Sequence, residues 1–219
     1  MVTDSDTSGS GSDASSGGSD VETPTPHRRR SWRTVDIVSA AVLGVAGGVL
    51  LVAANTLYGP VTAGPVALYP PLEGILTGLY VLPAVLGGLV IRKPGAALLT
   101  MVVAAVTSML VGNQWGFVTL WYGLAQGAGA EIAFAALGYR RWGPGAGVLA
   151  ALAAALGEAV LTVPLFYAGV GVDQQAARVG VGIASAVLLA GIGAWALTRA
   201  LAGTGALDAL ASGRAARRV

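Results

Sequence analysis

The chain has 219 residues, of which 54% are hydrophobic and only 11% are charged, and its mean hydropathy is +0.70. Soluble globular domains carry about 25% charged residues, so this composition indicates an integral membrane protein. The formal net charge is +2, but the basic residues form short clusters beside hydrophobic runs. That arrangement is a topology signal and not a nucleic-acid-binding patch.

The residue types exclude several kinds of chemistry. The chain has no cysteine and a single histidine, His27, which excludes disulfides, thiolate metal sites, histidine triads and zinc chemistry. Its single lysine, Lys93, is followed by Pro94, so it does not end a phosphate-binding Gly-Lys-Ser/Thr loop. We expect no metal and no cofactor. An enzyme is the weakest interpretation, because no nucleophile–base pair stands out.

The N-terminal residues differ in composition from the rest of the chain. Residues 1–31 are rich in Ser, Gly, Asp, Thr and Pro and have little apolar surface to bury, so we expect a disordered cytoplasmic tail. Its acidic character does not match a secretory signal peptide. We expect residues 32–203 to form the membrane domain and residues 204–219 to form a basic cytoplasmic tail.

Six hydrophobic segments follow the tail, each near the roughly 20 residues that an α-helix needs to cross a bilayer. Their predicted bounds are Asp36–Leu57, Leu72–Ile91, Gly95–Val111, Phe117–Gly138, Pro144–Ala168 and Val179–Leu201. The sequence therefore predicts an all-α polytopic membrane protein, a bundle of six transmembrane helices.

The basic residues predict the orientation of this bundle. Twelve of the thirteen lie on one side of the six-helix arrangement, and Arg178 is the exception. Because Lys and Arg concentrate on the cytoplasmic side of membranes, we expect both termini in the cytoplasm. The longest outer connection is then Tyr58–Pro71, which contains four prolines. It is either a lid over a site or a simple connector.

Three glutamates, Glu73, Glu131 and Glu158, lie within hydrophobic segments that contain no basic residue. A charged side chain at membrane depth costs roughly 3 kcal/mol or more. Such carboxylates must therefore be protonated, hydrogen bonded or available to a cation. We interpret them as part of a site for a positively charged ligand.

Amide and aromatic side chains share the outer level of the bundle with Glu73 and Glu158, and they can hydrogen-bond to a ligand or stack on it. The predicted substrate-binding residues are Glu73, Asn113, Trp115, Tyr122, Gln126, Glu131 and Glu158. Simpler roles stay open: aromatic residues gather at membrane interfaces, Asn113 can cap a turn, and a carboxylate such as Glu73 is favourable at a helix N-terminus. Glu131 lies deeper, and it either lines the site or is a protonated hydrogen-bond partner between helices.

The first hydrophobic segment carries small residues at every fourth position, namely Ala40, Gly44 and Gly48. Such a face lets another helix backbone approach closely. The neighbour is either a helix of the same chain or a second membrane protein.

Several short segments resemble the substrate-binding S components of energy-coupling factor (ECF) transporters, specifically the YkoE group. They are Trp32–Val38, Arg92–Ala97, Gly112–Gly116 and Gln126–Glu131, and the resemblance covers Trp32–Leu201. It implies a subunit that captures thiamine or its hydroxymethylpyrimidine precursor at the extracellular face, with a transmembrane coupling (T) component and two cytoplasmic ATPases as partners. It also implies that Ala40, Gly44 and Gly48 contact the coupling component, although the familiar ladder has alanine at both ends.

Two other functions compete with this interpretation. In a proton- or sodium-coupled secondary transporter of a small cationic solute, Glu131 and Glu158 would carry the ion. Six helices are few for such a carrier, and the sequence has no visible inverted repeat. A membrane scaffold without a ligand would leave the outer polar cluster unexplained.

Overall fold

The computed structural model describes residues 31–216, and the main compact unit of the chain begins at Trp32. The predicted N-terminal tail lies outside the described residues, apart from Ser31. All regular structure in the described part is helical. The elements are α1 (Thr34–Ala63), α2 (Pro65–Leu68), the 3-10 helix η2 (Pro70–Leu76), α3 (Thr77–Ile91), α4 (Ala96–Val111), α5 (Val118–Ala136), α6 (Pro144–Phe166), α7 (Val172–Ser185), the π-helix η3 (Ala186–Ile192), α8 (Gly193–Gly203) and α9 (Ala211–Ala216).

Each of the six predicted segments corresponds to one helix or to one continuous run of helices. The second is η2 followed by α3, and the sixth is α7, η3 and α8. Within the described residues, four runs are long and apolar enough to span a membrane, and a fifth helix is apolar but shorter. The four runs are Thr34–Ala63, Pro70–Ile91, Pro144–Phe166 and Val172–Gly203, and the shorter helix is Ala96–Val111. The predicted all-α membrane protein is confirmed at this level.

Two helices are longer than the hydrophobic pattern indicated, and both extensions affect the site. Helix α1 continues past Leu57 to Ala63 and includes Tyr58 and Pro60, so much of the predicted Tyr58–Pro71 connection is helical. Helix α7 begins at Val172, before the predicted start of the sixth segment. The hydrophobic pattern missed its first turns because they are polar. Arg178 therefore lies inside a helix and not in a loop.

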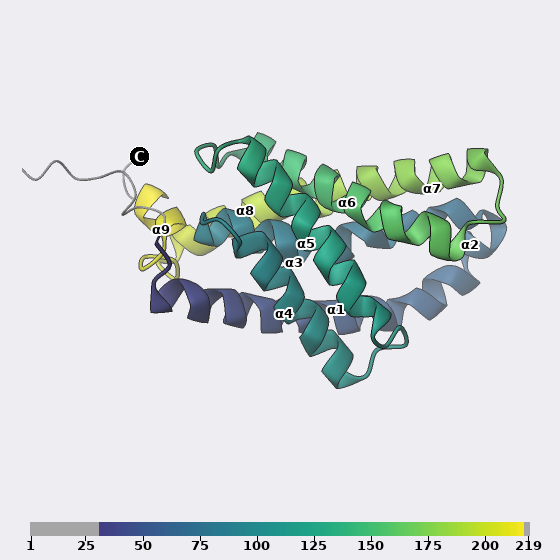
Figure 1. The fold of residues 1–219 in the computed structure, drawn as a ribbon, viewed down its shortest axis with the longest axis horizontal. Coiled ribbons are helices and arrows are strands. Elements are labelled where there is room, and N and C mark those ends of the chain that lie inside the picture. Colours follow the sequence, from purple (N-terminus) through teal and green to yellow (C-terminus); the bar gives the residue numbers. More distant parts are fainter. Residues whose placement is uncertain (1–30, 217–219) are drawn as a thin grey trace, which may run out of the picture. The chain divides into compact units, whose positions relative to one another are not determined.

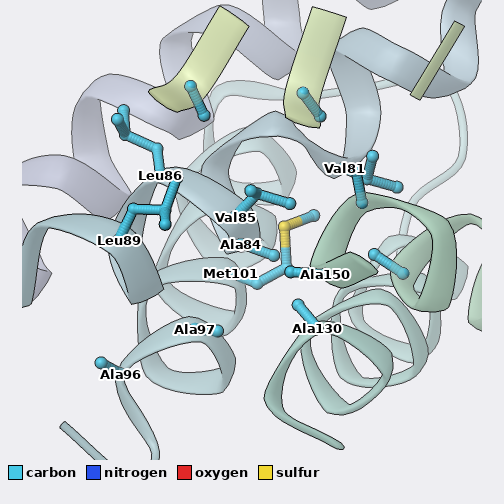
Figure 2. Close-up of a cluster of buried hydrophobic side chains, with 14 of the residues drawn as sticks. Val81, Ala84, Val85, Leu86, Leu89, Ala96, Ala97, Met101, Ala130 and Ala150 are labelled. Atoms are coloured by element: carbon cyan, nitrogen blue, oxygen red, sulfur yellow. The ribbon is translucent and has the colours of Figure 1, made fainter. Parts of the chain in front are cut away.

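Helix α3 is at the centre of the bundle. It contacts α1, α4, α5, α6, α7 and α8, and Figure 1 shows it between the other helices. Its apolar side chains, among them Val81, Val85 and Leu89, are buried. Figure 2 shows them with Met101 of α4 and Ala150 of α6 in the core. The many alanines and glycines of the neighbouring helices permit this close packing of backbones.

The small-residue face of α1 packs inside the protein. Ala40, Gly44 and Gly48 are buried, and a Cβ atom added at Gly44 would lie 2.5 Å from Cβ of Val103 in α4. A Cβ atom at Gly48 would overlap Thr107 of the same helix. Of the two roles left open for this ladder, the contacts match internal packing. The exposed face of α1 instead carries Ile37, Val38, Val42, Val45 and Val49.

Polar contacts join the start of α1 to the α3–α4 connection and to the segment before α9. Lys93 Nζ lies 2.5 Å from Oδ2 of Asp36 in α1, and the Trp32 indole donates to the carbonyl oxygen of Pro94 at 3.1 Å. Arg33 donates to the carbonyl oxygen of Ala209 at 2.8 Å. Leu207 and Leu210 are buried in the core. Within the segment predicted as a basic tail, residues 207–210 therefore pack against the bundle, and α9 lies near the start of α1 (Figure 1).

Candidate ligand-binding site

A cavity of about 330 Å³ lies inside the bundle, bordered by α1, η2, α3, α4, α5, α6, α7 and the turn that carries Trp115. Its volume is at the lower end of the roughly 300–1,000 Å³ that is typical of small-molecule sites. Its lining residues are Leu51, Asn55, Tyr58, Glu73, Tyr80, Met101, Ser108, Trp115, Thr119, Tyr122, Gln126, Glu158, Thr162, Phe166, Tyr167 and Arg178.

Helix α6 shows how the cavity runs along the bundle. Glu158, Thr162 and Phe166 line it at intervals of four residues, which corresponds to a length of about 12 Å at 1.5 Å per residue. Two hydrogen bonds show which residues of α5 lie opposite these positions. Tyr122 Oη and Thr162 Oγ1 are 2.9 Å apart, and Gln126 Nε2 donates to Glu158 Oε2 at 3.4 Å. We refer to the Glu158 end and the Glu73 end of the cavity.

The Glu158 end is organised around a buried ion pair. Glu158 Oε1 accepts from Arg178 Nη2 and from Thr77 Oγ1, each at 3.0 Å, while Oε2 accepts from Gln126. Glu158 is 3% exposed and Arg178 is 5% exposed. Two buried charges that pair and hydrogen-bond offset part of the cost of their desolvation.

This pair corrects the expectation that the buried carboxylates have no resident counterion. The hydrophobic pattern placed Arg178 in an outer connection, because it began the sixth segment at Val179. Helix α7 begins earlier, at Val172, and its register brings Arg178 to α6. A search for basic residues within the segment of Glu158 could not find a partner that lies on another helix.

Glu73 bonds to Tyr167, which follows Phe166 at the end of α6, so it lies at the other end of this stretch with a different set of partners. Tyr167 Oη donates to Oε2 at 2.7 Å, and Tyr58 Oη donates to Oε1 at 3.4 Å. Because a phenol is protonated at neutral pH, the Tyr167 hydroxyl is the donor to the Glu73 carboxylate. None of the ion pairs among residues 31–216 involves Glu73.

Aromatic rings surround the Glu73 end. Trp115 meets Tyr58 edge to face with ring centroids 5.1 Å apart, and it meets Phe166 in the same way at 5.8 Å. The guanidinium of Arg178 lies 5.5 Å from the ring centroid of Tyr167. These rings provide flat apolar surfaces next to a carboxylate, which is an arrangement that favours a flat or cationic ligand.

Asn113 does not line the cavity, but it holds the turn that does. Its Oδ1 atom accepts from the backbone N–H groups of Trp115 and Gly116, both at 2.9 Å, and from Thr119 Oγ1 at 3.0 Å. Its Nδ2 atom donates to Ser108 Oγ at 3.1 Å. These are the contacts of a residue that caps a turn, and they fix the position of Trp115.

Glu131 lies outside the cavity. Its carboxylate accepts from the backbone N–H groups of Gly95 at 2.6 Å and Ala97 at 3.1 Å, and from Tyr139 Oη at 2.6 Å. The first N–H groups of a helix lack partners within the helix, and Glu131 supplies one at the start of α4. Of its two predicted roles, these contacts match a hydrogen-bond partner between elements.

Five of the seven predicted site residues line the cavity, namely Glu73, Trp115, Tyr122, Gln126 and Glu158. The lining residues that the sequence interpretation missed include Asn55, Tyr80, Phe166 and Arg178. Phe166 carried a usable signal, because it lies eight residues after Glu158 and so shares its helical face. Nothing in the sequence distinguishes Tyr80 from an aromatic residue at the membrane interface, or Arg178 from a charged residue in a loop.

Apolar helices around a cavity with buried polar groups define a membrane-embedded solute-binding or transport protein. Three similarities narrow this class. A family model described as "ABC-type cobalt transport system, permease component" matches residues 35–164. The Bacillus subtilis (strain 168) protein named "Putative HMP/thiamine permease protein YkoE" is 30% identical over 189 residues, which are 84% of this chain and 92% of that protein.

A solved structure gives the third similarity. It is described as "Crystal structure of an S-component of ECF transporter", and it matches with a TM-score of 0.76 and 28% identity over 86% of this chain and 94% of that one. The chain therefore belongs to the S components of ECF transporters, as its motifs indicated. It is a multi-pass membrane subunit of a transporter and not an enzyme.

Proposed function

We propose that this S component binds thiamine or its hydroxymethylpyrimidine precursor at the extracellular face and delivers it for ATP-driven uptake. The name of the B. subtilis relative, an HMP/thiamine permease, supports this substrate class. The observation that carries the proposal is the Glu73 end of the cavity, where a carboxylate outside the described ion pairs adjoins Trp115 and Phe166.

The cavity matches the chemistry of thiamine, which joins a positive thiazolium ring to a flat aminopyrimidine. Glu73 supplies the negative charge, Trp115 and Tyr122 supply aromatic faces, and Gln126 supplies an amide at the Glu158 end. A cation over an aromatic ring contributes roughly 1 kcal/mol when it is desolvated. Asn113 contributes by holding Trp115, and Glu158 contributes by holding Gln126.

Formal charges in the cavity favour a ligand with a single positive charge. Arg178 offsets Glu158, so Glu73 is the carboxylate whose charge a ligand can neutralise. A singly charged thiazolium leaves the occupied cavity near neutrality, whereas a dication would add an uncompensated buried charge.

We further propose six membrane crossings with both termini in the cytoplasm, so that the Glu73 end faces the outside. Twelve of the thirteen basic residues support this orientation. The exception, Arg178, is buried in an ion pair and therefore does not report on a loop as the positive-inside rule assumes.

The proposed partners are a T component and two ATPases. A contact between the T component and the ladder of Ala40, Gly44 and Gly48 would require α4 to separate from α1, because α4 covers that face. The exposed apolar face of α1 is accessible without such a movement.

Uptake by reconstituted vesicles separates this function from a secondary transporter. We expect labelled thiamine to enter only when the T component, both ATPases and ATP are present. Uptake by this chain alone, driven by a proton or sodium gradient, would contradict the proposal and favour the carrier.

A further inference from the structure

The phenol of Tyr80 lines the cavity and has no partner within the described protein. Its Oη atom is buried and makes no hydrogen bond among residues 31–216. Buried hydroxyl groups are almost always hydrogen bonded, because a buried group without a partner destabilises the fold. An unsatisfied phenol in the wall of a binding cavity therefore points to an acceptor that arrives with the ligand.

The neighbouring carboxylate does not supply this acceptor. Tyr80 lies one turn after Thr77 on α3, and Thr77 bonds to Glu158, which places Tyr80 at the Glu158 end. Neither oxygen of Glu158 accepts from Tyr80: Oε1 accepts from Thr77 and Arg178, and Oε2 accepts from Gln126. The Nε atom of Arg178 is also buried without a partner among the described residues.

This end of the cavity consequently has two buried donors without a partner among the described residues, Tyr80 Oη and Arg178 Nε, and its carboxylate is already paired with Arg178. A cationic part of a ligand finds no unpaired carboxylate at this end, whereas an uncharged acceptor such as a heteroaromatic ring nitrogen can accept from these donors. The Glu73 end differs, because it offers aromatic rings and a carboxylate outside the ion pairs of the described residues.

We propose that Tyr80 is a specificity-determining residue that donates a hydrogen bond to an uncharged ring nitrogen of the ligand. The ligand then lies along the cavity with its acceptor-bearing ring at the Glu158 end and its positive ring at the Glu73 end. This inference rests on the proposed function. Thiamine fits it because the ring nitrogens belong to the pyrimidine and the charge belongs to the thiazolium.

Titration of purified full-length protein with thiamine and with two analogues tests the inference. In each analogue one pyrimidine ring nitrogen is replaced by C–H. We expect Tyr80→Phe to weaken thiamine binding roughly tenfold. For one analogue, wild type and Tyr80→Phe should bind equally, because the acceptor is already missing. The matched control is Tyr69→Phe, since Tyr69 is exposed and lies outside the cavity, and it should bind all three compounds as wild type does.

Thermal unfolding without ligand provides a second measurement. Tyr80→Phe removes a hydroxyl that makes no bond within the described protein, so we expect an unchanged or higher Tm. A lower Tm together with equal loss of affinity for all three compounds would show a purely structural role and overturn the inference. Wild-type affinity of Tyr80→Phe for thiamine would also overturn it. If wild-type protein binds none of the compounds, the proposed function itself fails, and this inference fails with it.

Discussion

The Nη2 atom of Arg178 lies 3.0 Å from Oε1 of Glu158, in a pair whose side chains are 6% and 4% exposed. This pair joins α7 to α6 inside the bundle. It neutralises Glu158, one of the three glutamates that the sequence presented as candidates for a cationic ligand, and we therefore propose Glu73 for that role. The two acids of the cavity thus differ, because Glu158 is paired with Arg178 while Glu73 is in none of the ion pairs among residues 31–216.

The ion pair predicts a non-additive effect on stability. Arg178→Gln or Glu158→Gln alone leaves one buried charge without its partner, and we expect each to destabilise the protein by about 3–5 kcal/mol. The double variant removes both charges and should be more stable than the sum of the single effects implies. Thermal unfolding in detergent measures this. Strictly additive losses would mean that the two side chains do not interact.

Glu73 should discriminate between charged and neutral ligands. Glu73→Gln keeps the shape of the side chain but removes its charge, so we expect thiamine affinity to fall roughly tenfold or more. The affinity for uncharged hydroxymethylpyrimidine should change much less. The control is Glu131→Gln, which lies outside the cavity and should leave both affinities unchanged. Equal losses for the two ligands would assign Glu73 a structural role.

The α1–α4 contact should be sensitive to side-chain size on one face only. Gly48→Val would force a side chain into Thr107, and we expect a loss of about 1–3 kcal/mol or failure to fold. Val49→Leu, on the exposed face, should have little effect. Unfolding of both variants in detergent makes the comparison. A Gly48→Val protein as stable as wild type would show that this face is open and available to a partner.

The orientation can be tested with single cysteines, because the chain has none. Gly169→Cys and Gly143→Cys replace glycines at opposite ends of α6 with no heavy atom within 4 Å of an added Cβ. In intact cells, a membrane-impermeant maleimide should label Gly169→Cys at once and Gly143→Cys only after lysis. The opposite result would reverse the proposed topology.

Much of the fold follows from local properties of the sequence. Apolar length predicts where helices lie, and it located all six helical runs. It failed where helices continue into polar sequence, as in the first turns of α7 before Arg178. Those turns are helical because backbone hydrogen bonds and packing against neighbouring helices stabilise them. Hydropathy does not detect either interaction.

The residue types of the site could be predicted from the sequence, but the contacts between side chains of different helices could not. Polar and aromatic residues at membrane depth directed attention to Glu73, Gln126 and Glu158, which do line the cavity. The pairing of Glu158 with Arg178 is a contact between separate helices, as is the covering of Gly48 by α4. Periodicity tells which residues share a face of a helix, and only packing tells what that face meets.

Calorimetric titration of the purified wild-type protein with thiamine, hydroxymethylpyrimidine and Co²⁺ tests the central claim most directly. We predict saturable binding of one thiamine or pyrimidine molecule per chain, which weakens when Trp115 is replaced by alanine, and no comparable binding of Co²⁺. Failure of both vitamin compounds to bind, or binding that is insensitive to Trp115→Ala and Glu73→Gln together, would contradict the assignment of this cavity.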